Sequence, residues 1–138
     1  MRSSVLLDTS GWIALLNSSD PQHAIARDRW LALANKGIRF VVTEWVIAET
    51  GNGMARSRTK NQFADVVRQT LDSPIVDVVP ITREVLESSL SLYESHSDKS
   101  WGLVDCASFI VMRDRGITDA FTSDRDFEQA GFQCLLSV

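Results

Sequence analysis

The sequence predicts an α/β fold in which a parallel sheet is covered by helices on both faces. Short apolar runs alternate along the chain with longer segments whose apolar residues recur at helical spacing. The short runs are apolar throughout rather than at every second residue, as is typical of strands buried on both faces. The chain has 138 residues and a mass of 15.4 kDa, which suits one domain spanning residues 1–138.

The strands are predicted from the apolar runs and from the turn residues that bound them. The first run is followed by Asp8-Thr9-Ser10, and the third is preceded by Ser73-Pro74. The last two runs are short and lie near the C-terminus. We expect five strands, at residues 4–7, 39–42, 75–79, 120–122 and 133–136.

The helices are predicted from apolar periodicity and from start and stop residues. We expect helices over 12–16, from 20–21 to 36–37, from 43 to 49, over 59–71, from 82 to 93 and over 103–112, and a helical turn over 124–129. Thr9 or Ser10 is available to cap the first helix, and Pro21 suits the first turn of the second. Thr43 and Thr82 are expected caps, and Gly116 is expected to end the sixth helix. Residues 51–53 (Gly-Asn-Gly) are expected to interrupt or loosen the third helix.

Eighteen acidic and fourteen basic residues give a net charge of −4, which excludes binding of nucleic acid by bulk positive charge alone. The first apolar run stops at Asp8, so it is too short for a secretory leader, and no run approaches the ~20 apolar residues of a membrane span. We therefore expect a cytoplasmic protein with no membrane partner. Cys106 and Cys134 fit no metal-binding spacing and are expected to be reduced and buried.

Four acids lie where the fold rule places ligands, outside the carboxyl ends of the strands. Asp8 and Asp124 each follow a strand closely, whereas Glu49 and Asp105 lie on helices. Taken singly, Asp8 and Asp124 could be helix caps, Asp105 could complement a helix dipole, and Glu49 could be a solvated helix acid. Together they would repel one another unless cations neutralise them.

Carboxylates are ligands for hard divalent cations, and we expect one or two Mg²⁺ or Mn²⁺ ions at these acids. Two such ions about 3.5–4 Å apart can activate water and stabilise the leaving oxygen of a phosphodiester. The chain has only two histidines, His23 and His96, and both lie outside this set, which disfavours zinc.

Four segments carry a resemblance to the PIN domain, the fold of VapC-like toxins and related ribonucleases. They contain the four acids in order and span nearly the whole chain: Leu7-Asp8-Thr9-Ser10, Thr43-Glu44-Trp45-Val46-Ile47-Ala48-Glu49-Thr50, Asp98-Lys99-Ser100-Trp101-Gly102-Leu103-Val104-Asp105-Cys106 and Thr122-Ser123-Asp124-Arg125-Asp126-Phe127.

The resemblance implies a three-layer α/β/α sandwich with a central parallel sheet of four or five strands. It also implies metal-dependent hydrolysis of RNA, with Asp8, Glu49, Asp105 and Asp124 as ligands, directly or through water, and a hydroxyl from Thr122 at the site. Two positions depart from the family pattern. Gly102 stands where Ser or Thr is common, which would remove a helix cap. Asp126 stands where relatives often carry His, and it is either a further group at the site or an exposed charge.

A short basic segment and three tryptophans are candidate contacts to RNA. Arg56, Arg58 and Lys60 follow Glu49 and either position a phosphate backbone or form a solvated helix connection. Three tryptophans lie within four residues of an expected ligand, and we expect them to wall the pocket rather than to stack on bases: Trp12, Trp45 and Trp101.

The function predicted is a divalent-metal-dependent endoribonuclease, as the toxin of a type II toxin–antitoxin pair. Within the same fold, a stand-alone RNA-processing nuclease and an inactive binding module remain as alternatives. A phosphotransfer protein with Asp8 as acceptor is disfavoured, because no lysine ends a strand and Ser10 replaces the second Asp of a haloacid-dehalogenase-like site. The resemblance further implies a homodimer and an inhibitory antitoxin that occupies the acidic groove.

Overall fold

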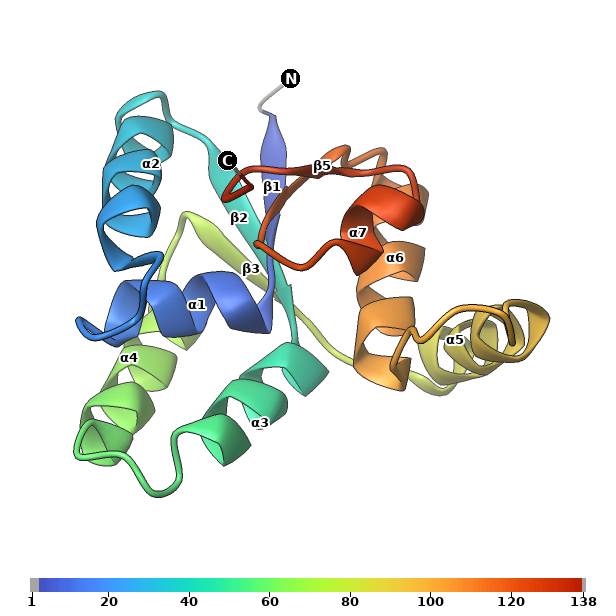
Figure 1. Ribbon diagram of the computed structural model, residues 1–138, viewed down its shortest axis with the longest axis horizontal. Coiled ribbons are helices and arrows are strands. Elements are labelled where there is room, and N and C mark those ends of the chain that lie inside the picture. The colour runs from blue at the N-terminus through green and yellow to red at the C-terminus, as the bar shows by residue number, and fades with distance from the viewer. Residues whose placement is uncertain (1–2, 138) are drawn as a thin grey trace.

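A five-stranded sheet, parallel throughout, runs through the middle of the computed structural model, which describes residues 3–137 (Figure 1). The strands are β1 (Ser4–Leu7), β2 (Arg39–Thr43), β3 (Val76–Val79), β4 (Asp119–Phe121) and β5 (Gln133–Cys134). Their order is β3-β2-β1-β4-β5. The chain therefore builds outward from β1 in one direction and then in the other, which puts a topological switch point between β1 and β4.

The helices cover the sheet on two sides, as the sequence predicts for an α/β/α sandwich. They are α1 (Thr9–Leu16), α2 (His23–Asn35), α3 (Glu44–Gly53), α4 (Lys60–Asp72), α5 (Arg83–Ser95), α6 (Leu103–Arg115) and α7 (Asp126–Gln129). Figure 1 shows α1, α2 and α4 on one side and α5, α6 and α7 on the other, with α3 below the carboxyl ends of the strands. Among residues 3–137, no helix combines the length and the apolarity needed to cross a membrane.

Successive residues of each central strand point into two different cores, because side chains alternate across a sheet. On β1, Leu6 packs with Phe109 and Met112 of α6, whereas Leu7 packs with Trp12 of α1 and its neighbours. Both cores are closed by aromatic pairs, such as Trp30 stacked on Phe40 with ring centroids 3.9 Å apart. Burial on both faces explains why these strands are apolar throughout.

A glycine allows α1 to lie directly against β4. A Cβ placed on Gly11 would come within 2.0 Å of the carbonyl oxygen of Phe121, closer than any real side chain allows. The backbone N–H of Asp8 also donates to this oxygen, at 3.4 Å. The start of α1 and the end of β4 are thus held together by main-chain atoms.

The predicted helix boundaries are correct at three caps. The hydroxyl oxygens of Thr43 and Thr82 accept from the N–H groups of Val46 and Val85, both at 3.2 Å, and cap α3 and α5. Gly116 ends α6 with a φ of 67°, a left-handed conformation that glycine adopts without strain.

Three expectations about the helices are wrong. First, α1 begins at Thr9, so neither Thr9 nor Ser10 is its cap, and both hydroxyls are used elsewhere. Second, α2 begins at His23 rather than at Pro21, because the Asp20 carboxylate accepts from the N–H of Gln22 at 2.8 Å and holds a turn there. Third, α3 continues through residues 51–53, with the two glycines inside the helix.

The strand boundaries shift by one or two residues. β2 includes Thr43, β3 begins at Val76, and β4 spans 119–121 instead of 120–122. β5 ends at Cys134, although Leu135 and Leu136 still donate backbone hydrogen bonds to Ala120 and Thr122, at 2.9 and 3.1 Å. The chain after β5 therefore stays attached to the segment that follows β4.

Candidate metal centre

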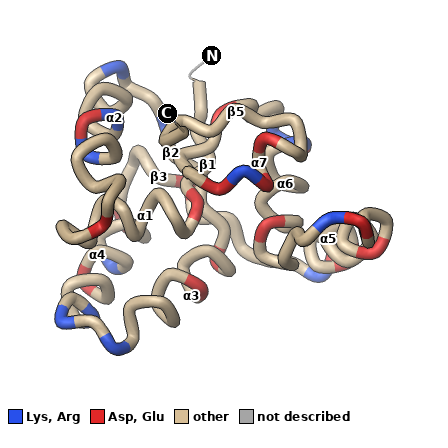
Figure 2. Tube along the Cα trace, in the orientation of Figure 1, with Lys and Arg blue, Asp and Glu red and all other residues tan. Residues whose placement is uncertain are grey.

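Acidic side chains meet where β1 and β4 end and where α6 and α7 begin. Asp105, Asp124 and Asp126 each offer a carboxylate oxygen, and these three oxygens lie within 4.8 Å of one another. Figure 2 shows acidic residues gathered around this end of the sheet. Three carboxylates at such spacing favour a bound cation, which would offset their mutual repulsion.

Asp8 lies at the bottom of this region and is only 3% exposed. Its Oδ2 accepts from the hydroxyl of Thr122 at 2.8 Å and from that of Ser10 at 3.2 Å. Burial raises the pKa of Asp8, these hydrogen bonds oppose the rise, and the charge of Asp124 adds to it. Asp8 is therefore coupled to the three-acid group while its own hydrogen bonds come from the protein.

Asp105 projects from the first turn of α6, one turn after Gly102, the residue that precedes the helix. Its Oδ2 accepts from the N–H of Gly102 at 3.4 Å, which is the half of a capping box that an acid at this position provides, while Gly102 has no hydroxyl to provide the other half. Burial and then the charges of Asp8 and Asp124 raise the pKa of Asp105 to about 7, against a smaller lowering by Gly102. Without a cation, this carboxyl therefore keeps its proton to a higher pH than an ordinary aspartic acid does.

A tight turn places Asp124 and Asp126. The N–H of Asp124 donates to the Thr122 hydroxyl oxygen at 3.0 Å, and the N–H of Asp126 donates to Asp124 Oδ1 at 2.9 Å. Burial, and then the charge of Asp124, raises the pKa of Asp126. Of the two roles that the sequence leaves open for Asp126, a group at the site and an isolated exposed charge, this geometry favours the first.

Glu49 lies on the exposed side of α3, outside the three-acid group. Its Oε1 accepts from the hydroxyl of Thr9 at 2.7 Å, which holds α3 against the start of α1. Its charge contributes to the raised pKa of Asp105, so the two carboxylates act on each other. All four acids that the sequence predicts are thus coupled, with Glu49 at the rim.

The sequence did not predict that the hydroxyl groups of Ser10 and Thr9 contact the acids of this site. Ser10 contacts Asp8, lies 2.8 Å from the Thr122 hydroxyl and accepts from the N–H of Ser123 at 3.2 Å. Thr9 holds Glu49. Their position directly after Asp8 is the signal that indicates them, because residues that follow a strand at its carboxyl end face the same crevice.

The basic group at Arg56, Arg58 and Lys60 is not brought into the acidic region. These residues lie on the turn between α3 and α4 and at the start of α4, and all three are exposed. Figure 2 shows this basic turn at the far end of α3 from the acids. Glu49 is four residues from the end of α3, a rise of about 6 Å, so the basic turn lies beyond the rim of the site.

Two of the three tryptophans pack in the cores, and the third lines a cavity. Trp12 and Trp101 are 4% and 6% exposed and belong to the two cores. Trp45 is half-buried and lines a cavity of about 310 Å³ between α3 and α6, together with Glu49 and Val104.

The donor set at the acids fits a hard divalent cation. It consists of carboxylate and hydroxyl oxygens, and the pKa values of Asp8, Asp105 and Asp126 are all raised by neighbouring negative charge as well as by burial. A cation would reverse the effect of that charge. Neither histidine nor cysteine is in the three-acid group, which keeps zinc disfavoured.

The fold and the acidic site together define the class of protein. The PIN-domain family model matches residues 5–133, and the chain belongs to this family. The chain is 32% identical over 128 residues to the 23S rRNA-specific endonuclease VapC20 of Mycobacterium tuberculosis, covering 93% of this chain and 95% of that protein.

Several solved structures have the same fold as this chain. The crystal structure of M. tuberculosis VapC20, described as a sarcin-ricin loop cleaving toxin, superposes with a TM-score of 0.82 at 31% identity over 93% of this chain and 95% of that one. VapBC2 from Rickettsia felis bound to a promoter DNA fragment gives 0.68 at 16% identity, covering 95% and 96%. FitAcB from Neisseria gonorrhoeae gives 0.62 at 19% identity, covering 94% and 95%. These last two likenesses support the fold alone.

Proposed function

We propose that this chain is a divalent-metal-dependent endoribonuclease that hydrolyses RNA phosphodiester bonds, and that it is the toxin of a type II toxin–antitoxin pair. The observation that carries the proposal is the convergence of Asp105, Asp124 and Asp126, with oxygens within 4.8 Å of one another and coupled to buried Asp8. A bound divalent cation would offset the repulsion among these carboxylates.

The reaction needs a cation, and Mg²⁺ or Mn²⁺ suits an all-oxygen donor set. When bound, one or two such ions activate water and offset negative charge on the phosphate being cleaved. Asp105, Asp124 and Asp126 would hold such an ion. Asp8 and Glu49 would take part as well, directly or through water.

The hydroxyl groups give the carboxylates fixed positions. Thr122 donates to Asp8 and accepts from the N–H of Asp124, so one side chain aligns both acids. Ser10 supports the Asp8 carboxylate from the other side. Pre-set ligands lower the cost of ordering the site when a cation and a phosphate enter it.

The choice of a toxin over a stand-alone RNA-processing nuclease or an inactive module rests on the relatives. VapC20 is named as an rRNA endonuclease and as a toxin, and the similarity covers nearly the whole of both chains. All four expected acids are present here as well, which counts against an inactive module. A cytoplasmic location, a homodimer and an antitoxin in the acidic groove follow from the same proposal.

Cleavage assays test this function. The purified protein should cut 23S rRNA or a mixed RNA substrate with Mg²⁺ or Mn²⁺ and should stop when EDTA is added. Asp8→Asn should abolish cleavage and keep the fold, because the amide can still accept from Thr122 and Ser10. Asp28→Asn, at an exposed position of α2, is the matched control. Cleavage by Asp8→Asn at the wild-type rate would overturn the assignment.

The toxin assignment has its own test. A gene for a small DNA-binding protein should overlap this gene or lie just upstream, and its product should co-purify with the chain and inhibit cleavage. A cleaving enzyme without such a neighbour would indicate a housekeeping nuclease.

A further inference from the structure

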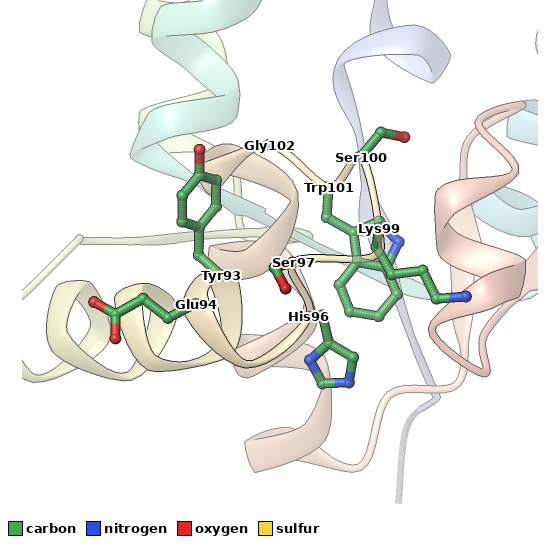
Figure 3. A pocket seen from close by; sticks show the side chains of 8 residues that line it. All are labelled: Tyr93, Glu94, His96, Ser97, Lys99, Ser100, Trp101 and Gly102. Atoms are coloured by element: carbon green, nitrogen blue, oxygen red, sulfur yellow. The ribbon is translucent and has the colours of Figure 1, made fainter.

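A second hollow opens beside the acidic region. It encloses about 480 Å³ and is formed by one continuous stretch of chain, from the end of α5 through the connection to α6 (Figure 3). Tyr93, His96, Lys99 and Trp101 are among the residues that line it. The chemistry assigned above to the acids uses none of these side chains.

The lining combines aromatic rings with one cation. The indole of Trp101 forms the floor and is fixed from below by Phe109, at a centroid distance of 5.2 Å and an angle of 76°. The imidazole of His96 lies 4.9 Å from the indole at 31°. The ring of Tyr93 is half exposed, and Figure 3 shows it at the opposite side of the hollow from Lys99. Flat rings of this kind stack on nucleobases.

The floor also carries a hydrogen-bond donor without a partner. The Nε1 of Trp101 is buried and makes no hydrogen bond within the part of the chain that the structure describes. A buried donor left unpaired is unfavourable, so an acceptor that a ligand brings to the indole N–H would favour binding. Figure 3 shows the indole nitrogen on the side of the ring where the Lys99 side chain extends.

Among the residues that line the hollow, Lys99 supplies the positive charge and Glu94 a negative one, histidine being taken as neutral. Figure 3 shows Glu94 on the Tyr93 side, away from Lys99. The Lys99 ammonium is 3.9 Å from the Asp98 carboxylate, a long contact between partly exposed groups. Exposed pairs of this kind are worth little, so the ammonium remains available to a phosphate.

The hollow adjoins the proposed metal site through the backbone. Gly102 lines the hollow, and its N–H donates to Asp105 Oδ2 at 3.4 Å. Asp105 follows one helical turn later, a rise of about 5 Å. The Gly102 edge of the hollow is therefore about one helical turn from Asp105.

We propose that this hollow is a nucleotide subsite: it holds one unpaired base of a single-stranded RNA segment against His96, Tyr93 and the Trp101 indole N–H, with a flanking phosphate on Lys99. The proposal rests on the proposed ribonuclease function, and it assigns the segment over residues 93–102 to recognition of the strand next to the cleaved bond. It would give a protein of net charge −4 a local means of holding RNA beside its acids.

Binding can be measured without cleavage. In ¹H–¹⁵N spectra of the whole chain with Mg²⁺, the indole N–H signal of Trp101, assigned with Trp101→Phe, should shift saturably on addition of nucleoside 5′-monophosphates. Ribose 5-phosphate, which lacks a base, should leave it in place. His96→Ala and Lys99→Gln should each weaken binding about tenfold, as expected for a lost stacking partner or a lost phosphate contact. No shift, or an equal shift with ribose 5-phosphate, overturns the subsite.

Kinetics separate this inference from the proposed function. Lys99→Gln should raise KM for a short RNA about five- to tenfold and change kcat less than about twofold, whereas Lys36→Gln, at an exposed lysine after α2, should change neither. An indole shift in a protein that never cleaves would contradict the nuclease proposal and keep the subsite. Efficient cleavage with unchanged kinetics in His96→Ala and Lys99→Gln, together with no indole shift, would contradict the subsite and keep the nuclease proposal.

Discussion

Asp8 and the group formed by Asp105, Asp124 and Asp126 share one crevice but have different surroundings. Asp8 is 3% exposed, and two hydroxyl groups donate to it. The three others are partly exposed, and the hydrogen bonds recorded for their carboxylates come from backbone N–H groups, to Asp105 and Asp124. The protein thus supplies the partners of one acid and leaves much of the neutralisation of the others to something bound.

This difference assigns the two parts of the crevice different tasks. A buried carboxylate with fixed donors keeps its position whether or not a cation is present. Carboxylates that raise one another's pKa change their protonation and spacing when a cation binds. We therefore expect variants that remove the hydroxyl partners of Asp8 to affect stability as well as activity. Variants in the three-acid group should affect activity and metal response.

The largest effect is expected from removing charge in the three-acid group. The double variant Asp105→Asn, Asp124→Asn should lower kcat/KM for RNA cleavage on the order of 10³-fold or more, because two oxygen ligands are weakened together. Mn²⁺ should raise the melting temperature of the wild type, because an ion at 100 times its Kd stabilises the folded state by about 2.7 kcal/mol. The double variant should lose this rise. A double variant that still melts higher with Mn²⁺ would place the ion elsewhere.

The next largest effect is expected on stability. Thr122→Val should lower the free energy of unfolding by about 1–3 kcal/mol, because fully buried Thr122 serves both Asp8 and the N–H of Asp124. Chemical denaturation measures this change, and Thr122→Ser should restore most of it. Thr70→Val, on α4, removes only a hydroxyl that returns to the Val66 carbonyl and serves as control. Equal losses in the two valine variants would contradict the role of Thr122.

The pH dependence of stability should be smaller but opposite to that of most carboxylates. The raised pKa of Asp105, about 7 against 3.8, means that the folded state binds a proton more tightly than the unfolded state. This contribution is complete below pH 3.8 and is lost as pH rises through about 7. With EDTA present, the melting temperature should therefore rise by several degrees from pH 8.5 to 5.5. Asp105→Asn should flatten the dependence of melting temperature on pH, and Asp28→Asn should not. If the wild type and Asp105→Asn show the same dependence, the contribution of Asp105 is excluded.

The smallest effect is expected from the basic turn. Changing Arg56, Arg58 and Lys60 to glutamine should raise KM about two- to fivefold at low salt and leave kcat unchanged, because the turn lies beyond the rim of the acids. The same change at Arg27, Arg29 and Lys36 is the control. A tenfold loss in kcat would show that the turn reaches the scissile phosphate.

The sequence predicted the fold well because apolar runs and helix-capping residues act on the backbone next to them in the chain. Apolar runs marked the strands, and Thr43, Thr82 and Gly116 marked helix ends with their own hydrogen bonds or dihedral angle. It failed where a polar residue had two possible partners. Ser10 and Thr9 fit a helix cap equally well, and only the approach of β4 and α3 shows that they serve other acids.

The site was predicted in part for the same reason. The rule for parallel sheets already indicated Asp8, Glu49, Asp105 and Asp124, and the resemblance pointed to the same four acids. Spacing along the chain could not show that Asp126 turns toward Asp124, since this depends on one backbone hydrogen bond in a tight turn. Nor could it show how far the basic turn lies from the acids, because that depends on α3 continuing through residues 51–53.

The contact at Gly11 sets how closely the start of α1 approaches the end of β4. With only hydrogen at position 11, α1 lies directly against both the backbone carbonyl and the ring of Phe121. The spacing between the segments that carry Asp8 and Asp124 therefore depends on a residue without a side chain. A single added methyl group at position 11 would wedge the two acids apart.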